Sequence, residues 1–232
     1  MAGKISYIKS AVFEKDYPVH DKFEVAFMGR SNAGKSSLIN NLSKSKIANV
    51  SQMPGKTRLL SFFNFADSYV LVDMPGYGYA SRSGSEVDEW QPMIEAYLSE
   101  RGCLAGLVLV MDIRRKWTKE EVVLVQFVQN YGRPVAIALT KADKITKSEI
   151  AKAVAKHKKD SKINEVFVVS NTKETGYKEL EDHIYKSWIV PQEEDYAAMK
   201  KAEKEEAKAA QAQAEEEEGF DEDLDNDSEN ES

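Results

Sequence analysis

The sequence predicts an α/β fold in which helices cover both faces of a mostly parallel, six-stranded sheet. Short apolar runs alternate with segments of helical periodicity along residues 23–190. Such alternation is typical of a parallel sheet with helices on both faces. Two of the runs, 107–111 and 135–139, are apolar throughout, as expected for strands that are covered on both sides. Polar motifs follow several strand ends, where such folds bind their ligands.

Each predicted element follows from a local pattern. The six strands are the apolar runs at residues 23–28, 59–65, 69–73, 107–112, 135–139 and 166–169. Helical spacing of apolar residues lies near residues 35–43, 88–101, 118–131, 146–160 and 176–188. Thr118 and Glu121 have the spacing of a capping box at the start of the third helix. Residues 23–190 form the predicted domain, and residues 1–22 form an N-terminal extension with a candidate edge strand.

Cysteine usage and hydropathy limit where the protein acts. Cys103 is the single cysteine in 232 residues, so no disulfide can form within the chain, which fits a reducing cytoplasm. The sequence holds no secretory leader pattern and no run of roughly 18 apolar residues that would span a membrane. Three histidines and one cysteine disfavour a Cys/His metal site. We expect a cytoplasmic monomer without a membrane partner.

Charge is divided unequally along the chain. The net charge is −7, but residues 193–232 hold 17 acidic and 4 basic residues, a net charge of −13. The remaining 22 acidic and 28 basic residues give residues 1–192 a net charge of +6. Beyond Gly219 only Phe220 and Leu224 are apolar, which is too little to offset the entropy of ordering. We predict an acidic disordered tail at residues 191–232, transiently helical up to Glu218, after a basic body suited to polyanions.

Residues 29–36 match the phosphate-loop pattern GxxxxGK[ST]. The motif lies between a predicted strand and a predicted helix, which disfavours an ordinary glycine-rich turn. Successive N–H groups at a helix N-terminus attract phosphate, Lys35 reaches the outer phosphates, and the Ser36 hydroxyl suits Mg²⁺. The candidate nucleotide-binding residues here are Gly29, Arg30, Ser31, Asn32, Ala33, Gly34, Lys35, Ser36 and Ser37.

Two further segments complete a candidate phosphate and Mg²⁺ site. Asp73 ends a predicted strand and can hold Mg²⁺ through water, and the Gly76 amide can sense the γ-phosphate. Thr57, in the segment PGKTR at 54–58, can close over Mg²⁺, although an ordinary loop threonine is the alternative. Lys35, Thr57 and Gly76 are the predicted catalytic residues. The remaining candidate binding residues of these segments are Gly55, Lys56, Met74 and Pro75.

The segment Thr140, Lys141, Ala142 and Asp143 follows another strand and fits recognition of guanine. A carboxylate at Asp143 can accept both the N1–H and the exocyclic N–H of guanine, a pair of donors that adenine lacks. The Lys141 stem can lie across the base. The predicted site closes with Val169, Ser170 and Asn171. The triplet at residues 170–172, SNT, lies where a loop amide would bind guanine O6, although a turn or helix cap explains that triplet equally well. We predict GTP rather than ATP as the nucleotide.

These motifs resemble the EngB/YihA/YsxC family of bacterial ribosome-assembly GTPases. The matching segments are residues 29–40, 54–58, 71–80, 111–114, 139–143 and Ser170, of which DMPGYGYA is the most specific. The resemblance implies a P-loop NTPase G domain and a role in assembly of the large (50S) ribosomal subunit. It also implies rRNA and ribosomal proteins as partners and a requirement in cell division and septation. The run of residues 115–118, RKWT, departs from the His-Pro-Leu-like run that is common in the family.

The residue after Gly76 bears on turnover. Tyr77 stands where Ras-like proteins carry the glutamine that orients the attacking water, so we predict slow intrinsic hydrolysis. A GTP-gated protein- or RNA-binding module that hardly hydrolyses GTP is the alternative. Asn32 matches the asparagine that ligates K⁺ in related GTPases, and such a K⁺ would neutralise developing charge. Alternatively, Asn32 only tolerates a left-handed turn.

Two surfaces are candidates for binding partners. Lys152, Lys156 and Lys159 share one face of a predicted helix, and residues 114–116 form a basic loop. A solvated helix face explains the lysines equally well. Segments 50–60 and 74–90 are the expected nucleotide switches. Three aromatic residues of the second switch, Tyr77, Tyr79 and Trp90, are a second candidate partner surface. For Trp90, a position in the core is the alternative.

Overall fold

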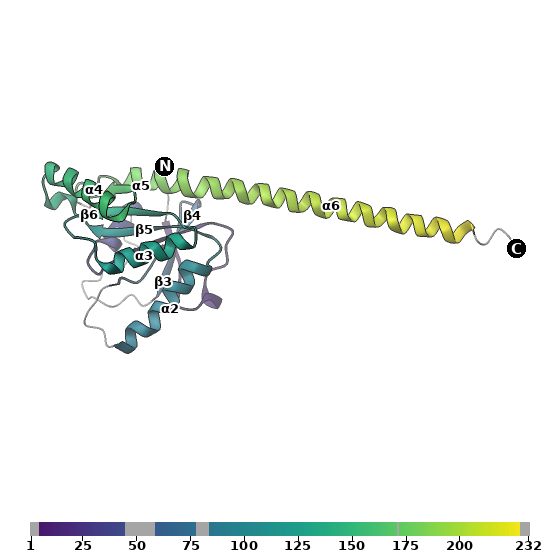
Figure 1. The fold of residues 1–232 in the computed structure, drawn as a ribbon, viewed down its shortest axis with the longest axis horizontal. Coiled ribbons are helices and arrows are strands. Elements are labelled where there is room, and N and C mark those ends of the chain that lie inside the picture. Colours follow the sequence, from purple (N-terminus) through teal and green to yellow (C-terminus); the bar gives the residue numbers. More distant parts are fainter. Residues whose placement is uncertain (1–4, 45–58, 78–83, 171, 228–232) are drawn as a thin grey trace. The chain divides into compact units, whose positions relative to one another are not determined.

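A seven-stranded sheet organises the first of two structural units, Met1–Ile189 (Figure 1). The computed structural model describes residues 5–44, 59–77, 84–170 and 172–227. The strands lie in the order β1-β3-β4-β2-β5-β6-β7. Their bounds are β1 Ile5–Ala11, β2 Glu24–Gly29, β3 Leu60–Phe65, β4 Tyr69–Asp73, β5 Leu104–Asp112, β6 Val135–Thr140 and β7 Val166–Val168.

The sheet is mostly parallel, as predicted. Strands β4, β2, β5, β6 and β7 pair in parallel, whereas β3 and β1 pair antiparallel at one edge. All six predicted strands are present, and the seventh is β1 in the N-terminal extension. In β1 only the end residues Ile5 and Ala11 are buried, while Tyr7 and Ile8 are exposed. Burial at only the two ends of the strand gives a weak apolar signal, so the predicted six-stranded sheet did not include it. Its place at the edge of the sheet agrees with the candidate edge strand in the N-terminal extension.

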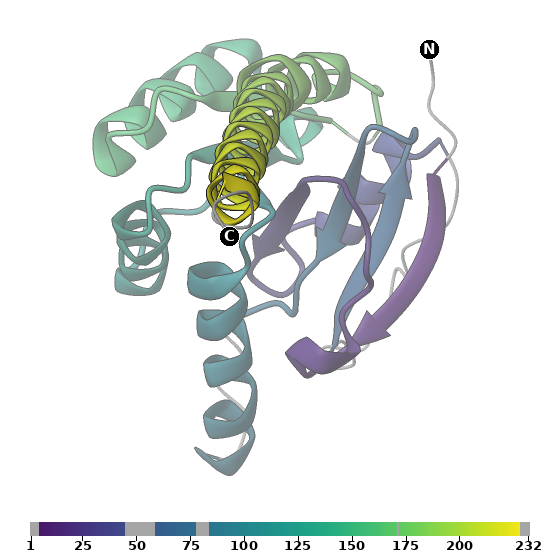
Figure 2. The same cartoon turned by 90° about the vertical axis from the view of Figure 1, so that its right-hand side faces the viewer.

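Helices cover both faces of the sheet (Figure 2). Helices α2 (Gly84–Glu100), α3 (Lys119–Asn130) and α4 (Lys147–Ser161) pack on one face. Helices α1 (Lys35–Leu42) and α5 (Tyr177–His183) pack on the other. Alternate residues of β5 divide between the two cores, because successive side chains of a strand point to opposite faces. Leu107, Leu109 and Met111 join the first core, and Val108 and Val110 join the second. Ala105 also joins the second core, because the register of β5 against β2 shifts near the start of the strand.

Helix ends agree with the local sequence, with one difference. The Glu121 carboxylate accepts the Thr118 backbone N–H at 2.8 Å, so the predicted capping box is confirmed. The described chain also has two short 3₁₀ helices, Glu14–Asp16 and Ala142–Lys144, and a π-helical turn, Ile184–Ile189. That π turn interrupts the helix predicted at 176–188. It seats Trp188 against Gly106, where a Cβ would lie 2.8 Å from the indole ring.

The second unit, Val190–Ser232, carries a helix along the segment predicted to be an acidic disordered tail. Helix α6 spans Val190–Asp227 and is rich in alanine, glutamate and lysine, which have high helix propensity. Ion pairs along the helix, such as Lys200–Glu203 at 3.1 Å, add local support. The helix includes the segment up to Glu218 that was predicted to be transiently helical, and disorder of the tail stays a prediction. Within the described residues, no helix is both long enough and apolar enough to cross a membrane.

Candidate functional site

The phosphate loop connects β2 to α1 in a conformation that depends on its small residues. A Cβ at Gly29 would lie 2.4 Å from the Val110 carbonyl oxygen, so only glycine fits against β5. Asn32 and Gly34 both have left-handed backbone, with φ of 64° and 95°. Gly34 is the N-cap of α1, and Lys35 and Ser36 occupy its first turn. The loop therefore presents a helix N-terminus, which favours anions.

Lys35 and Asp73 lie together at the phosphate end of the site. The Lys35 ammonium forms an ion pair with the Asp73 carboxylate, and the two side chains are only 10% and 9% exposed. Burial lowers the pKa of Lys35 to about 7, while the neighbouring carboxylate acts in the opposite direction. The structure thus brings together the residue expected to contact phosphate and the residue expected to hold Mg²⁺.

The segment after β4 lies against the phosphate loop. The Met74 N–H donates to the Phe27 carbonyl at 3.0 Å, and the Ser31 N–H donates to the Tyr77 carbonyl at 3.3 Å. A Cβ at Gly76 would lie 3.1 Å from the Gly29 carbonyl oxygen. Close backbone approach explains why glycine occupies position 76.

Tyr77 is buried rather than displayed. Its side chain is 6% exposed, and its hydroxyl donates to the Glu121 carboxylate of α3 at 3.2 Å. Burial and the adjacent Glu121 both raise the Tyr77 pKa well above its usual value. Arg30 of the phosphate loop also reaches α3, with Glu120 at 3.1 Å. The prediction that Tyr77 contributes to an exposed partner surface is therefore wrong.

Thr140 ties the base-recognition segment to the phosphate loop. The residue is fully buried, and its hydroxyl oxygen lies within hydrogen-bond distance of the Ala33 carbonyl and 3.1 Å from the Met111 carbonyl. A hydroxyl has one proton, which these two acceptors share. Thr140 thus fixes the spacing between the phosphate loop and the segment predicted to recognise the base.

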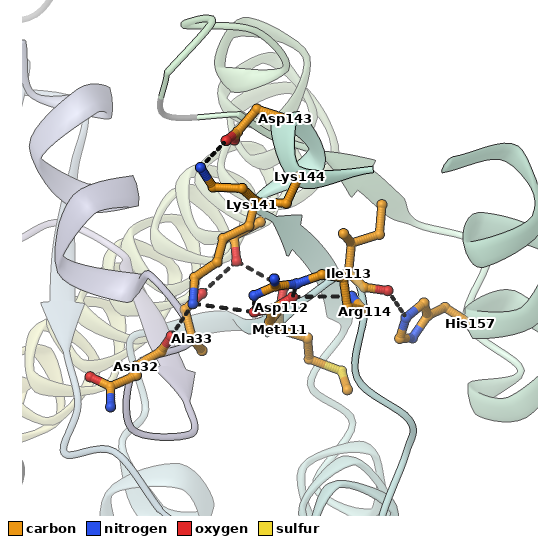
Figure 3. A network of polar contacts seen from close by, with 11 residues as sticks. Asn32, Ala33, Met111, Asp112, Ile113, Arg114, Lys141, Asp143, Lys144 and His157 are labelled. Atoms are coloured by element: carbon orange, nitrogen blue, oxygen red, sulfur yellow. Dashed lines mark hydrogen bonds and ion pairs between the residues drawn. The ribbon is translucent and has the colours of Figure 1, made fainter. Parts of the chain in front are cut away.

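Lys141 extends along the phosphate loop (Figure 3). Its ammonium donates to the Asn32 carbonyl at 2.7 Å and lies 3.2 Å from the Asp112 carboxylate. Its left-handed backbone, with φ of 60°, turns the chain after β6. Because the Lys141 ammonium is held by Asn32 and Asp112, the aliphatic part of its side chain extends from the base-recognition segment to the phosphate loop. The predicted role of Lys141 is to cover the base with this aliphatic part.

Asp143 is oriented by Ser170 from the neighbouring strand end. The Ser170 hydroxyl donates to the Asp143 carboxylate at 3.0 Å, and the Lys144 ammonium lies 3.3 Å from the same carboxylate. Burial works to raise the pKa of Asp143, but Ser170 and Lys144 lower it below its usual value. Asp143 is therefore an ionised acceptor, as the predicted recognition of guanine requires. Val169 and Ser170 are both buried beside it.

Asp112, at the end of β5, is a site residue that the sequence patterns did not single out. Its carboxylate accepts from the Arg114 guanidinium at 2.9 and 2.6 Å and from the Arg114 N–H at 3.1 Å (Figure 3). Burial works to raise the pKa of Asp112, but Arg114 and Lys141 pull it well below its usual range. An acidic residue at the carboxyl end of a buried strand was the available signal.

His157 anchors the segment that follows Asp112. The Trp117 indole N–H donates to His157 Nδ1 at 3.0 Å, so the imidazole is neutral there and carries its proton on Nε2. Nε2 lies 3.4 Å from the Ile113 carbonyl. This contact gives a structural role to the segment 115–118, which departs from the family pattern.

Several predicted residues lie outside the described part of the chain or act differently. The predicted residues that lie outside the described part of the chain are Gly55, Lys56, Thr57, Asn171 and Tyr79, together with the Trp90 side chain. Lys152, Lys156 and Lys159 are exposed on α4, and Lys156 pairs with Asp160 at 3.1 Å. The lysine face is thus available to solvent, and its role in binding RNA stays a prediction.

The fold and the arrangement of the phosphate loop, Asp73, the base-recognition segment and Ser170 define a P-loop GTPase. Residues 24–141 match a family described as "50S ribosome-binding GTPase". The "Probable GTP-binding protein EngB" of Bdellovibrio bacteriovorus is 59% identical over 189 residues, covering 82% of this chain and 94% of that protein. Its counterpart in Clostridium beijerinckii is 42% identical over 186 residues, covering 78% and 94%. The chain belongs to the EngB family of P-loop GTPases.

Solved structures agree on the fold. A crystal structure of a probable GTP-binding protein engB superposes with a TM-score of 0.59 at 21% identity, covering 70% of this chain and 97% of that chain. Era in complex with MgGDPNP and nucleotides of 16S ribosomal RNA superposes with a TM-score of 0.59 at 24% identity, covering 72% and 57%. At these identities the likeness concerns the fold alone.

Proposed function

We propose that this GTPase hydrolyses GTP slowly and acts as a nucleotide-controlled switch in assembly of the large ribosomal subunit. The observation that carries the proposal is the match of residues 24–141 to a family described as 50S ribosome-binding. The net charge of +6 on residues 1–192 suits rRNA and its ribosomal proteins as partners. The proposed place of action is the cytoplasm, where ribosomes are assembled.

The described residues fit distinct proposed roles in nucleotide binding. Lys35 neutralises charge on the outer phosphates, and the Gly76 amide senses the γ-phosphate. Thr57, which lies outside the described residues, keeps its predicted role of closing over the metal. Asp143, held by Ser170, reads guanine, and Lys141 covers the base. Because Tyr77 is committed to Glu121, it cannot orient a water as a glutamine would, which supports slow intrinsic hydrolysis.

The donor set around Lys35 fits Mg²⁺. Hard oxygen ligands suit this ion, and the Asp73 carboxylate ends β4 near the first turn of α1, which carries Ser36. Among the described residues no cluster of three or more His, Cys, Asp or Glu forms a metal site, so phosphates and water would complete the shell. When bound, the ion would neutralise the charge that develops on the phosphates. Ser36, Asp73 and Thr57 are its proposed ligands.

A K⁺ ion bound through the Asn32 side chain is a further proposal for charge neutralisation. The carbonyl of Asn32 accepts from Lys141, and its backbone is left-handed, so Asn32→Gly keeps the turn while removing the side chain. We expect several-fold faster turnover in KCl than in NaCl for the natural chain, and no difference for Asn32→Gly. Equal multiple-turnover rates of the natural chain in the two salts would refute the K⁺ site.

Co-sedimentation combined with GTP turnover tests the proposed function. The purified chain is mixed with 30S or 50S subunits and with GDP or a non-hydrolysable GTP analogue, in KCl. We expect selective binding to 50S subunits with the analogue and faster GTP turnover in their presence. Nucleotide binding without preference for either subunit would remove the ribosome from the proposal.

A GTP-gated binding module is the second candidate function. The buried Tyr77 favours it, since its hydroxyl donates to Glu121 and does not face a water at the phosphate end. Binding to 50S subunits without accelerated turnover would support this module over the enzyme switch.

The implied requirement in septation is tested separately, by depleting the protein and comparing cell length with the accumulation of incomplete large subunits. Long cells without incomplete subunits would separate division from assembly.

A further inference from the structure

The Asp112 carboxylate is shared by two cations from different parts of the site. Its side chain is 6% exposed, and its Oδ2 atom lies 2.6 Å from the Arg114 guanidinium and 3.2 Å from the Lys141 ammonium (Figure 3). Lys141 also donates to the Asn32 carbonyl of the phosphate loop at 2.7 Å. Asp112 therefore connects Arg114 to Lys141, and Lys141 in turn links the base-recognition segment to the phosphate loop.

Arg114 faces both this carboxylate and solvent. Its side chain is 48% exposed although it holds Asp112, and Arg115 and Lys116 beside it are also exposed. These three residues, hereafter the basic loop, stand on a fixed backbone. The Ile113 N–H donates to the Thr140 carbonyl at 3.0 Å, and Trp117 is held by His157. The basic loop can therefore exchange side-chain partners without unfolding.

The basic loop also adjoins the phosphate loop. Asp112 and Arg115 line the same small cavity as Arg30 and Ser31. Consecutive cationic side chains, two of them planar guanidinium groups, suit the phosphodiester groups of RNA. Phosphate contacts of this kind depend on charge and not on base sequence.

We propose that rRNA phosphates bind the basic loop and draw Arg114 away from Asp112, and that this exchange tightens the hold on guanine nucleotide. The proposal rests on the proposed function, because it takes RNA as the partner. Once the Arg114 guanidinium pairs with phosphate, more of the Asp112 charge acts on Lys141, although the Arg114 N–H still donates to that carboxylate, and repulsion between Lys141 and Arg114 falls. Lys141 is then fixed more firmly on the Asn32 carbonyl. Binding free energies are reciprocal, so nucleotide strengthens RNA binding by the same factor.

The release rate of a fluorescent GDP analogue measures this coupling directly. With the full chain at low salt, we expect purified large-subunit rRNA to slow release about twofold to fivefold, the size of a partly exposed ion pair. Arg114→Gln should release nucleotide slowly without RNA and respond no further when RNA is added. Asp112→Asn should release nucleotide faster than the natural chain and also fail to respond. The coupling thus predicts opposite changes of the release rate in Arg114→Gln and Asp112→Asn. If each substitution merely destabilised the site, release would be faster in both variants.

Lys186→Gln is the matched control. Lys186 is an exposed cation that pairs with Asp182 at 3.4 Å, so its loss removes the same charge outside the basic loop. This variant should keep the natural release rate and its response to RNA. Equal responses of Arg114→Gln and the natural chain would overturn the proposal, as would failure of rRNA to slow release from the natural chain. Equal slowing by polyglutamate would overturn the assignment to RNA phosphates.

Failure of this coupling and failure of the proposed function give different results. Selective co-sedimentation with 50S subunits alongside RNA-insensitive release would leave the switch in ribosome assembly and reject the coupling. Slower release with free rRNA but no subunit preference would support the coupling and reject the ribosome-assembly switch.

Discussion

The two ends of the nucleotide site are built on different principles. At the base end, Thr140, Lys141 and Asp143 are held by carbonyl oxygens, by Asp112 and by Ser170, none of which the proposed nucleotide contacts would displace. At the phosphate end, Lys35 and Asp73 are held by each other, and both are proposed to turn toward phosphate or Mg²⁺. The base end is thus set in advance, while the phosphate end must exchange partners.

This difference has an energetic consequence. Breaking a buried ion pair without replacing it costs about 3–5 kcal/mol, so Lys35 and Asp73 can separate only when phosphates and a metal ion supply new charges. At the base end only Asp143 gains new partners, and it is already ionised and oriented. In the proposed function, base recognition therefore depends on local hydrogen bonds, whereas phosphate binding depends on the coordinated arrival of nucleotide and Mg²⁺.

Removal of Lys35 should break the phosphate end most severely. Lys35→Ala leaves the Asp73 carboxylate nearly buried without its partner and removes the proposed phosphate contact, so we expect about 10³-fold weaker GTP binding and loss of hydrolysis. Titration with a fluorescent GTP analogue and a phosphate-release assay measure both effects. Lys178→Ala, which removes an exposed lysine of α5, is the control and should change neither. GTP affinity within tenfold of the natural value would contradict the role of Lys35.

A substitution at Asp143 should break the base end without disturbing phosphate contacts. Asp143→Asn replaces an acceptor with an amide that can donate, so we expect about 100-fold weaker GDP binding and a preference for xanthosine diphosphate, whose C2 oxygen can accept. Competition between GDP and xanthosine diphosphate in equilibrium titrations gives the ratio. Lys144→Gln, which removes the exposed cation beside the carboxylate, should keep the preference for GDP. Unchanged preference in Asp143→Asn would place base recognition elsewhere.

The sequence predicts these two ends unequally, for physical reasons. Gly29, Lys35, Asp73 and Asp143 could be placed because their roles follow from motifs with fixed spacing at strand ends. Asp112 could not, because its role depends on Arg114 and on a lysine 29 residues away meeting at one carboxylate. Contacts between side chains that are far apart in the chain leave no periodic pattern in the sequence from which they could be predicted.

The same limit applies to Tyr77 and to the tail. An aromatic residue after a glycine reads equally well as exposed or buried, and only the position of Glu121 on α3 decides in favour of burial. In α6, composition indicated too little apolar surface for a core, which is consistent with the half-buried Gln192 and the exposed side chains from Glu193 to Lys208. It did not indicate how far local helix propensity extends.

Loss of the Tyr77 hydroxyl tests whether the phosphate end uses this residue in catalysis. Tyr77→Phe removes one hydrogen bond to a carboxylate, so we expect a loss of about 1–2 kcal/mol in the free energy of unfolding, with GDP affinity and GTP turnover within twofold of natural values. Urea unfolding and phosphate release provide the two readouts. Tyr131→Phe, at a half-exposed tyrosine, should leave stability unchanged. A large fall in turnover at unchanged stability would assign the hydroxyl to the reaction.

The smallest expected effect concerns the support behind the base end, through His157. Burial lowers the pKa of His157 from 6.5, although Asp160 and the Ile113 carbonyl oppose this shift. As the pH falls below about 6.5, the unfolded chain therefore takes up a proton before the folded chain does, and the free energy of unfolding decreases. His157→Gln should reduce this loss between pH 7.5 and 5.5 in urea unfolding measured at a series of pH values. Burial also lowers the pKa of His183, so part of the dependence should remain in the variant. Identical pH dependence in both proteins would show that Trp117 tolerates a protonated His157, and that the segment behind Asp112 is held by packing and not by this hydrogen bond.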